Sequence, residues 1–503
     1  MARMRHLERR PWQAPTACAL ACAVVLALVC GLLAPAAQAR RPHGALHDEL
    51  DEYLAQNVPA TGVPGIAVAV VSSDGTEYQR TFGDCPGPDA AFTIGSLSKS
   101  FTALCIMQLV ERGEVDLDDP ASDYVPDYLV PEEVTVRSLL NQTSGFGYYE
   151  SLSQAQVGDT FGSFSYANAN YDLLGRIVES VSGLDYDEYL RENVFEPLGM
   201  TSASTQSSAV KSPKVDPGHR NYFGINVADG FSHDVSDDAW GADPSGYVQA
   251  SVSDMARYLQ MYLDKGEGIL SPVGIEAMVT DKVPDPYGST FYGMGWTTYY
   301  DDGDNLVMSH DGQVENYVAR MTIVPSSDVA VVVLGDSNDY FGGNSCFFDL
   351  ASGVVDIATG TPALYDVDPS DRVSQHLGLD IAYLALVLSS AVPLFSLGSW
   401  RRRLVSALEQ DRPLWPRVAL AILVHLALPM FLLDLPRQLG YQWRDLSMFV
   451  PDLALVLVAV AAILFAGGCV KVVVWALAAR AESPGDAFDR RARAAAHKAG
   501  GGA

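Results

Sequence analysis

The chain has 503 residues and carries 61 acidic against 33 basic side chains, which gives a formal net charge of −28 at pH 7. Residues 42–371 hold 51 of the acidic residues, whereas the two ends of the chain are basic overall. A segment this negative repels phosphate backbones and anionic lipid, so the composition argues against a nucleic-acid partner. A solvated, soluble surface is the simplest explanation of the charge.

The first 39 residues are predicted to be an export signal. A start with four arginines precedes an apolar run over residues 17–33, and Ala37-Gln38-Ala39 provides a small-residue cleavage site. Because the run is short for a membrane span, we expect cleavage after Ala39, with an uncleaved anchor as the alternative.

The acidic segment begins and ends with strand patterns. Apolar β-rich runs over residues 65–71 and 77–82 predict a hairpin, and residues 305–309, 317–324 and 329–334 predict an antiparallel meander. Helical patterns lie between them, over residues 97–112, 135–141, 170–182, 186–194 and 253–264. We therefore predict an α+β fold, in which terminal helices flank one antiparallel sheet that carries an inserted helical region.

Three apolar stretches follow, over residues 381–397, 418–433 and 453–479, and each has about the length of a membrane-spanning helix. Arginines cluster between the first two stretches and again after the third. Cytoplasmic loops carry an excess of basic residues, so both clusters should be cytoplasmic and the acidic segment should lie across the membrane from them. His425, near the middle of the second stretch, is expected to make an interhelical hydrogen bond rather than to mark a proton path.

Three cysteines lie in the segment that we expect to be exported. Cys105 falls on a helix face that should be buried, and a disulfide between Cys85 and Cys346 is a further prediction. The sequence contains no Cys-x-x-Cys pattern and no Cys/His cluster with metal-ligand spacing, so we expect no metal and no other cofactor.

Ser96-Leu97-Ser98-Lys99 is a Ser-x-x-Lys motif at the start of an amphipathic helix. A spacing of three places the hydroxyl and the amine on one helix face, where the lysine can take the proton of the serine. The helix N-terminus adds N–H groups where negative charge develops during acyl transfer. To act as a base, Lys99 must be desolvated or lie near another cation, either of which lowers its pKa.

The motif alone is weak, because chance produces it about once in a chain of this length. A second copy runs from Ser208 to Lys211 in a polar, proline-flanked segment. We interpret this copy as a surface loop.

Further motifs accompany Ser96. Tyr166-Ala167-Asn168 precedes a helix, and His310-Asp311-Gly312 follows a predicted strand and leads through a turn to the next. In this order, and with Leu139-Leu140-Asn141-Gln142-Thr143-Ser144-Gly145 and Glu196-Pro197-Leu198-Gly199-Met200, the chain resembles the penicillin-binding-protein-like serine hydrolases. These comprise the class C β-lactamases, the D-Ala-D-Ala carboxypeptidases and related esterases and D-aminopeptidases. The resemblance extends over about residues 45–361.

The resemblance implies roles for individual residues. Ser96 would be the nucleophile, Lys99 its activating partner, and Tyr166 a phenol that relays protons between Ser96 and the leaving group. Asn168 would fix Lys99 and touch the substrate amide. Gln142 stands where relatives usually have histidine, in a segment that we expect to support the fold.

The third motif departs from that of the β-lactamases. His310 and Gly312 would form the strand along which the substrate lies, and the N–H groups of Ser96 and Gln313 would form the oxyanion hole. His310 replaces a lysine and Asp311 replaces a hydroxyl residue, so a substrate carboxylate should bind less well. We therefore expect a peptidase or esterase rather than a dedicated β-lactamase.

These expectations combine into one domain organisation. Residues 1–39 form the signal, 42–365 the serine hydrolase domain, 366–480 a three-helix membrane region and 481–503 a basic cytoplasmic tail. The predicted protein is a multi-pass protein of a bacterial cell membrane, whose extracytoplasmic domain hydrolyses a small molecule, peptide or ester, with residues 201–241 as one wall of its pocket. The alternative is a catalytically silent protein that binds ligand and acts as a sensor.

Overall fold

The computed structural model describes residues 43–481 except 209–211, 213–216, 267, 341, 365, 411–414 and 440, together with residue 492. The predicted export signal and almost all of the predicted cytoplasmic tail lie outside the described residues. Most of the second Ser-x-x-Lys copy, residues 209–211, also lies outside them.

An eight-stranded antiparallel sheet forms the centre of the domain that precedes the candidate membrane segments. Its strand order is β2-β1-β13-β12-β11-β10-β9-β8. The strands are β1 (Gly65–Ser72), β2 (Gly75–Gly83), β8 (Val283–Pro284), β9 (Phe291–Gly293), β10 (Trp296–Tyr300), β11 (Leu306–Val314), β12 (Tyr317–Val324) and β13 (Val329–Gly335). Strand β1 pairs with β13, so the N-terminal hairpin completes the C-terminal meander. The predicted α+β fold and its antiparallel sheet are confirmed.

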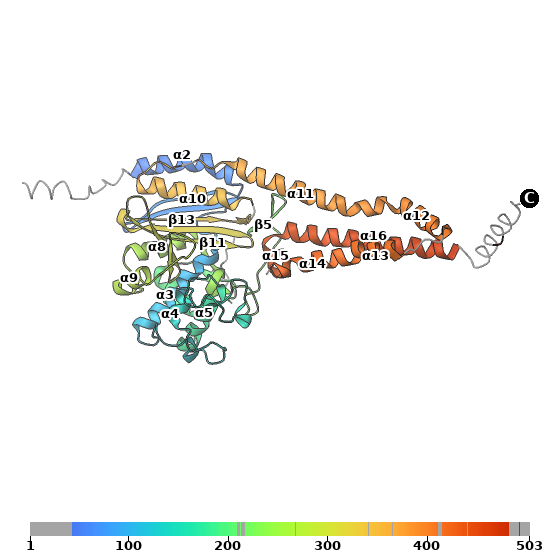
Figure 1. The fold of residues 1–503 in the computed structure, drawn as a ribbon. Coiled ribbons are helices and arrows are strands. Elements are labelled where there is room, and N and C mark those ends of the chain that lie inside the picture. Colours follow the sequence, from blue (N-terminus) through green and yellow to red (C-terminus); the bar gives the residue numbers. More distant parts are fainter. Residues whose placement is uncertain are drawn as a thin grey trace, which may run out of the picture. The chain divides into compact units, whose positions relative to one another are not determined.

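Every residue of strand β1 is buried, so both faces of the sheet are covered at this strand. Successive strand residues point to opposite faces. Ile66 and Val68 accordingly pack in one apolar cluster with α2 (His43–Thr61) and α10 (Asn344–Thr359), while Ala67 and Ala69 pack in a second cluster with the helical region (Figure 1). The domain therefore has three layers, with the terminal helices on one face of the sheet and the helical region on the other.

The helical region contains each of the helices expected from periodicity. It comprises α3 (Ser98–Glu111), α4 (Val136–Leu140), α5 (Asn168–Ser182), α6 (Tyr186–Leu190), α7 (Glu196–Leu198), α8 (Val252–Leu263) and α9 (Pro272–Thr280). The expected helix 186–194 instead changes to a π-helical turn at Arg191–Phe195. Two small sheets were not expected, one of β3 (Ala91–Thr93), β4 (Ser204–Thr205) and β7 (Val248–Ser251), the other of β5 (His219–Tyr222), β6 (Ile225–Val227) and β14 (Ser337–Asn338).

The cysteines differ from expectation in one respect. Cys105 is fully buried in the core, as predicted. The predicted disulfide between Cys85 and Cys346 is wrong, because both residues are thiols. They belong to apolar clusters on opposite faces of the sheet, where the Cys85 thiol donates to the Gly87 carbonyl oxygen and the Cys346 thiol to that of Asp368.

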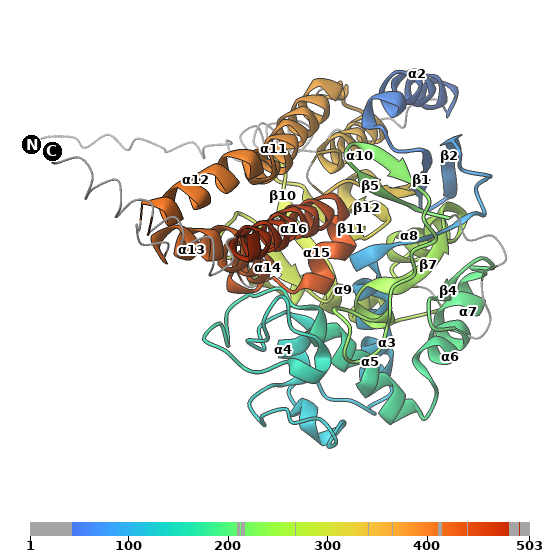
Figure 2. The ribbon, with the colours of Figure 1, turned by 90° about the vertical axis from the view of Figure 1, so that its right-hand side faces the viewer.

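Three candidate membrane-spanning segments follow this domain, at Arg372–Ser406, Ala419–Gln438 and Pro451–Leu477. They contain α11 (Pro369–Phe395), α12 (Leu397–Glu409), α13 (Trp415–Ile422), α14 (Leu428–Gln438) and α16 (Pro451–Ala481), and the short α15 (Trp443–Phe449) precedes α16. Helix α16 packs against both α11 and α14 (Figure 2). His425 Nδ1 lies 2.7 Å from the Leu464 carbonyl oxygen, which is the interhelical hydrogen bond that the sequence predicts.

Candidate active site

Ser96 and Lys99 lie where the chain passes from a 3₁₀ turn, Gly95–Leu97, into α3. Lys99 Nζ lies 3.2 Å from Ser96 Oγ and also donates to Asn168 Oδ1 at 2.8 Å and to the Ser245 carbonyl oxygen at 2.6 Å. Lys99 is fully buried, whereas Ser96 is half-buried. The helix thus presents the hydroxyl to a cavity and holds the amine behind it.

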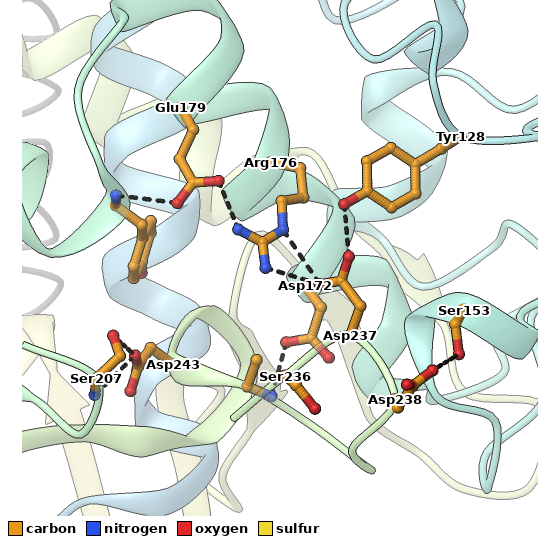
Figure 3. Close-up of polar contacts among 12 residues, drawn as sticks. Tyr128, Ser153, Asp172, Arg176, Glu179, Ser207, Ser236, Asp237, Asp238 and Asp243 are labelled. Atoms are coloured by element: carbon orange, nitrogen blue, oxygen red, sulfur yellow. Dashed lines mark hydrogen bonds and ion pairs between the residues drawn. The ribbon is translucent and has the colours of Figure 1, made fainter. Parts of the chain in front are cut away.

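Burial controls the protonation of Lys99. Loss of hydration lowers the pKa of its amine from 10.5 to about 7. The negative charge of the nearby Asp172 has the opposite, smaller effect and raises this pKa. Burial also raises the pKa of the Asp172 carboxyl, which accepts a hydrogen bond from the Ala242 N–H at 3.0 Å (Figure 3). Near neutral pH, a substantial fraction of Lys99 is a free amine that can accept a proton.

Tyr166 and Asn168 come from the N-terminal end of α5. The Tyr166 ring centroid lies 4.7 Å from Lys99 Nζ, and Tyr166 and Ser96 line the same cavity. Burial raises the pKa of this phenol well above its usual value, so Tyr166 remains protonated. Gln142 holds this turn, because its Oε1 accepts hydrogen bonds from the Ala167 N–H and from Asn170 Nδ2.

Strand β11 lies directly against the turn that carries Ser96. A Cβ on Gly312 would lie 2.1 Å from the Ile94 carbonyl oxygen, and one on Gly95 would lie 2.7 Å from the Gln313 nitrogen. Gly95 also has φ = 59°, a conformation that favours glycine. Both glycines are therefore needed for the close approach of strand and turn, which brings the Gln313 main chain beside that of Ser96.

His310 also lies in β11, which corrects the expectation that its triplet follows the strand. The ring is buried, and burial first, then the charge of Lys99, lowers its pKa to about 4. Nδ1 donates to the Asp311 carbonyl oxygen at 2.7 Å, so Nε2 of the neutral ring accepts from the Tyr292 hydroxyl at 3.4 Å. The Asp311 carboxylate instead pairs with Arg320, at 2.6 Å.

The predicted site residues meet at one place. Ser96, Tyr166, Asn168, His310 and Gln313 line a single cavity, and Lys99 and Gly312 lie directly behind its wall. Trp240 lines it too, from the segment 201–241 that was expected to form a wall.

The segment before Trp240 is held to the helical region by charged contacts, and the turn after Trp240 is hydrogen-bonded through Asp243 to residues 206 and 207 (Figure 3). Arg176 of α5 pairs with Asp237 at 2.7 Å, and Asp237 accepts a hydrogen bond from Tyr128 at 2.7 Å. Asp243 accepts from the main-chain N–H of Gln206, at 2.9 Å. These contacts fix one wall of the cavity relative to Asn168, which lies at the start of the same helix as Arg176.

Sequence reasoning missed several residues in and around the site. Ser245 contributes a main-chain carbonyl, for which the side-chain type gives no signal. Asp172 lies one helical turn after Asn168, so the spacing in α5 could have indicated it. Tyr292 and Glu315 come from segments without a recognisable motif. Among the described residues, no group of three or more His, Cys, Asp or Glu side chains could hold a metal ion.

Comparisons with known proteins agree with this geometry. The family model described as Beta-lactamase matches residues 48–344. Penicillin-binding protein 4 of Amycolatopsis lactamdurans is 29% identical over 311 residues, covering 54% of this chain and 80% of that protein. Protein flp of Staphylococcus aureus (strain COL) is 24% identical over 325 residues, covering 58% of this chain and 64% of flp.

Among solved structures, the octameric penicillin-binding protein homologue from Pyrococcus abyssi is similar, with a TM-score of 0.54 and 28% identity. The similarity covers 64% of this chain and 79% of that one. The family match includes Ser96, Lys99, Tyr166, Asn168 and the strand with His310. The chain therefore belongs to the Beta-lactamase family.

Proposed function

We propose that the protein is a membrane-tethered, extracytoplasmic serine hydrolase that cleaves amide or ester bonds through an acyl-Ser96 intermediate. The observation that carries this proposal is the contact of 3.2 Å between Lys99 Nζ and Ser96 Oγ, made by a buried amine with a pKa near 7. A nucleophile beside a base is the arrangement that covalent catalysis requires.

The proposed reaction has two stages. In the first, Ser96 Oγ attacks the substrate carbonyl carbon while its proton passes to the Lys99 amine. The N–H groups of Ser96 and Gln313 stabilise the negative charge on the carbonyl oxygen. The bond to the leaving group breaks as Tyr166 donates a proton to it, and Lys99 returns a proton to Tyr166. In the second stage, water attacks the acyl-serine and releases the acid.

The substrates that we propose are cell-wall-derived peptides, D-amino-acyl compounds or esters. The neutral His310 and the pairing of Arg320 with Asp311 disfavour a substrate whose binding depends on a carboxylate. This favours a peptidase or esterase over a dedicated β-lactamase. The basic residues of α12 and those at and beyond the end of α16 support an orientation with the catalytic domain outside the bacterial cell membrane.

The nucleophile is tested by intact-protein mass spectrometry of the full chain after treatment with a fluorophosphonate or a penicillin. We expect one adduct on the wild type and none on Ser96→Ala. An unlabelled wild type, or an adduct that persists in Ser96→Ala, would contradict the proposal. Reporter fusions at the C-terminus test the orientation, and we expect a cytoplasmic reporter to be active.

The rival function is a ligand-binding sensor without turnover. The buried Lys99 argues against it, because a module that only binds has no use for a lysine held neutral at this place. Steady-state hydrolysis of a chromogenic ester or a D-amino-acid amide would exclude the sensor. Stoichiometric labelling without turnover would support it.

A further inference from the structure

The cavity at Ser96 extends from the catalytic residues to the membrane-spanning part of the chain. It has a volume of about 800 Å³ and is lined by both. At one end lie Ser96, Tyr166 and His310, and at the other lie residues of α14, α15 and α16. The membrane region therefore forms part of the wall of the space in front of the nucleophile.

The wall contributed by the membrane region is mainly apolar. Most of its side chains are apolar, among them Leu435, Leu439, Leu446, Phe449, Leu453 and Leu457. Leu435 belongs to the candidate membrane-spanning segment Ala419–Gln438, and Leu453 and Leu457 belong to Pro451–Leu477. These spans end at the cavity, so the apolar wall begins at the boundary between hydrocarbon and water.

Specific contacts hold this wall against the catalytic domain. Arg444 of α15 donates to the Asp238 carbonyl oxygen at 2.8 Å, and Gln442 donates to that of Tyr149 at 3.3 Å. The Phe449 ring packs edge-on against Trp240, with 5.1 Å between centroids. The segment around Trp240 is the one tied to α5 through Asp237.

One polar side chain of the wall lacks a hydrogen-bond partner. The Asp445 side chain is 7% exposed and lines the cavity, and neither of its carboxylate oxygens is hydrogen-bonded among the described residues. Arg444 Nε forms an ion pair with Asp445 Oδ1 at 3.6 Å, which leaves Oδ2 without a hydrogen-bond partner among the described residues. Burial raises the pKa of this carboxyl, and a buried carboxylate is costly unless a donor or cation meets it.

From these observations we infer that the substrate is a membrane amphiphile, whose apolar chain lies against α14–α16 while its scissile bond reaches Ser96, and whose polar part brings a cation to Asp445. The inference rests on the proposed hydrolase function and names the class of its substrate. Catalytic domain and membrane helices then form one binding site, in which the helices do more than anchor the enzyme.

The chain length of the substrate tests the apolar wall. In the full-length protein in detergent, we would measure kcat/KM for p-nitrophenyl acetate, butyrate, hexanoate and octanoate. A methylene that enters an apolar site improves binding by up to about fourfold, so we expect kcat/KM to rise at least about tenfold from butyrate to octanoate. Rates that do not depend on chain length, with hydrolysis still dependent on Ser96, would overturn the inference and leave the proposed function intact.

Two substitutions on α16 separate the wall from a general effect of detergent. Leu453→Asn, at the cavity, should reduce the ratio of the octanoate rate to the butyrate rate at least about fivefold. Val472→Asn, at a 62% exposed position on the same helix, should leave the ratio unchanged. An equal change in both variants would contradict the inference. If no ester hydrolysis depended on Ser96, that result would instead contradict the proposed function.

Asp445 is tested by inhibition of p-nitrophenyl acetate hydrolysis with two amphiphiles, each kept below its own critical micelle concentration. Decylammonium should inhibit at least about tenfold more strongly than decanoate, because only the ammonium can pair with the buried carboxylate. Asp445→Asn should remove most of this difference. Asp434→Asn, which removes an acidic group of α14 outside the cavity lining, should retain it. Equal inhibition by the two amphiphiles in the wild type would exclude the cationic part of the inference.

Discussion

The Lys99 amine lies 3.2 Å from the Ser96 hydroxyl oxygen, and the same amine donates to the main-chain carbonyl oxygen of Ser245, at 2.6 Å. The second contact orients the nitrogen, and burial favours its neutral form. Protonation of Lys99 should therefore decide whether Ser96 can be activated.

The first prediction concerns the pH dependence of the reaction. The pKa of Lys99 is lowered to about 7, so the amine is protonated below this pH and neutral above it. We expect kcat/KM for a neutral ester to rise about tenfold per pH unit below about pH 7 and to level off above it. Initial rates from pH 5 to pH 9 measure the profile.

Asp172 provides the control for this assignment, because its negative charge raises the pKa of Lys99. In Asp172→Asn, the rising limb should move to lower pH, because the neighbouring charge that stabilises the ammonium is lost. A limb that stays in place, or moves to higher pH, would show that another group controls the reaction.

The second prediction concerns the close approach of β11 to the Ser96 turn. In Gly312→Ala, the new Cβ would lie 2.1 Å from the Ile94 carbonyl oxygen, so strand and turn must separate. A displacement of this kind should reduce kcat/KM by about 100-fold or more. Gly378→Ala in α11, where a Cβ meets no atom within 4 Å, should have no effect on the rate.

Ser96 and Lys99 could be predicted because their motif lies at the start of a helix with a clear apolar pattern, and Tyr166 and Asn168 because the order of the motifs resembles that of the penicillin-binding-protein-like serine hydrolases. Helix geometry then fixes the Ser96–Lys99 pair, and strands β12 and β13 begin at the predicted residues, because β-branched runs with clear turns leave little choice of register. His310 was placed after its strand rather than within it, because Asp311 and Gly312 resemble turn residues.

Other parts of the site could not be predicted from the sequence. Ser245 acts through its main chain, and no side-chain pattern reports a carbonyl oxygen that faces a distant lysine. The Cys85–Cys346 disulfide was wrong because counting cysteines contains no information about which face of a sheet each one occupies. The wall formed by α15 depends on contacts between segments about 200 residues apart.

The third prediction concerns the choice of substrate. His310 is neutral because burial and Lys99 lower its pKa to about 4. His310→Lys would place a potential cation on this strand, and a charge-assisted bond to a carboxylate contributes about 1.5–3 kcal/mol. We expect the rate of acylation by a penicillin to rise at least about tenfold, measured with a fluorescent penicillin. His310→Gln, which adds no charge, should bring no such increase; a gain in both variants would exclude the electrostatic explanation.

The fourth prediction concerns a buried hydrogen-bonded pair, His233 and Glu315. His233 Nδ1 lies 2.7 Å from Glu315 Oε1, and Nε2 lies 3.0 Å from the Gly241 carbonyl oxygen. Glu315 Oε1 also accepts a hydrogen bond from the Tyr247 hydroxyl, at 3.1 Å. Both side chains are 1% exposed, and the ring stacks on Tyr247 at 4.1 Å.

His233→Ala leaves the buried Glu315 carboxyl without one of its hydrogen-bond partners, so the free energy of unfolding should fall by about 1–3 kcal/mol. Thermal or denaturant unfolding of the purified full chain measures the loss. In the double variant His233→Ala/Glu315→Gln the carboxyl group that lost its partner is removed, so part of the stability should return. If the losses of the single variants His233→Ala and Glu315→Gln simply added in the double variant, the two side chains would not form a coupled pair.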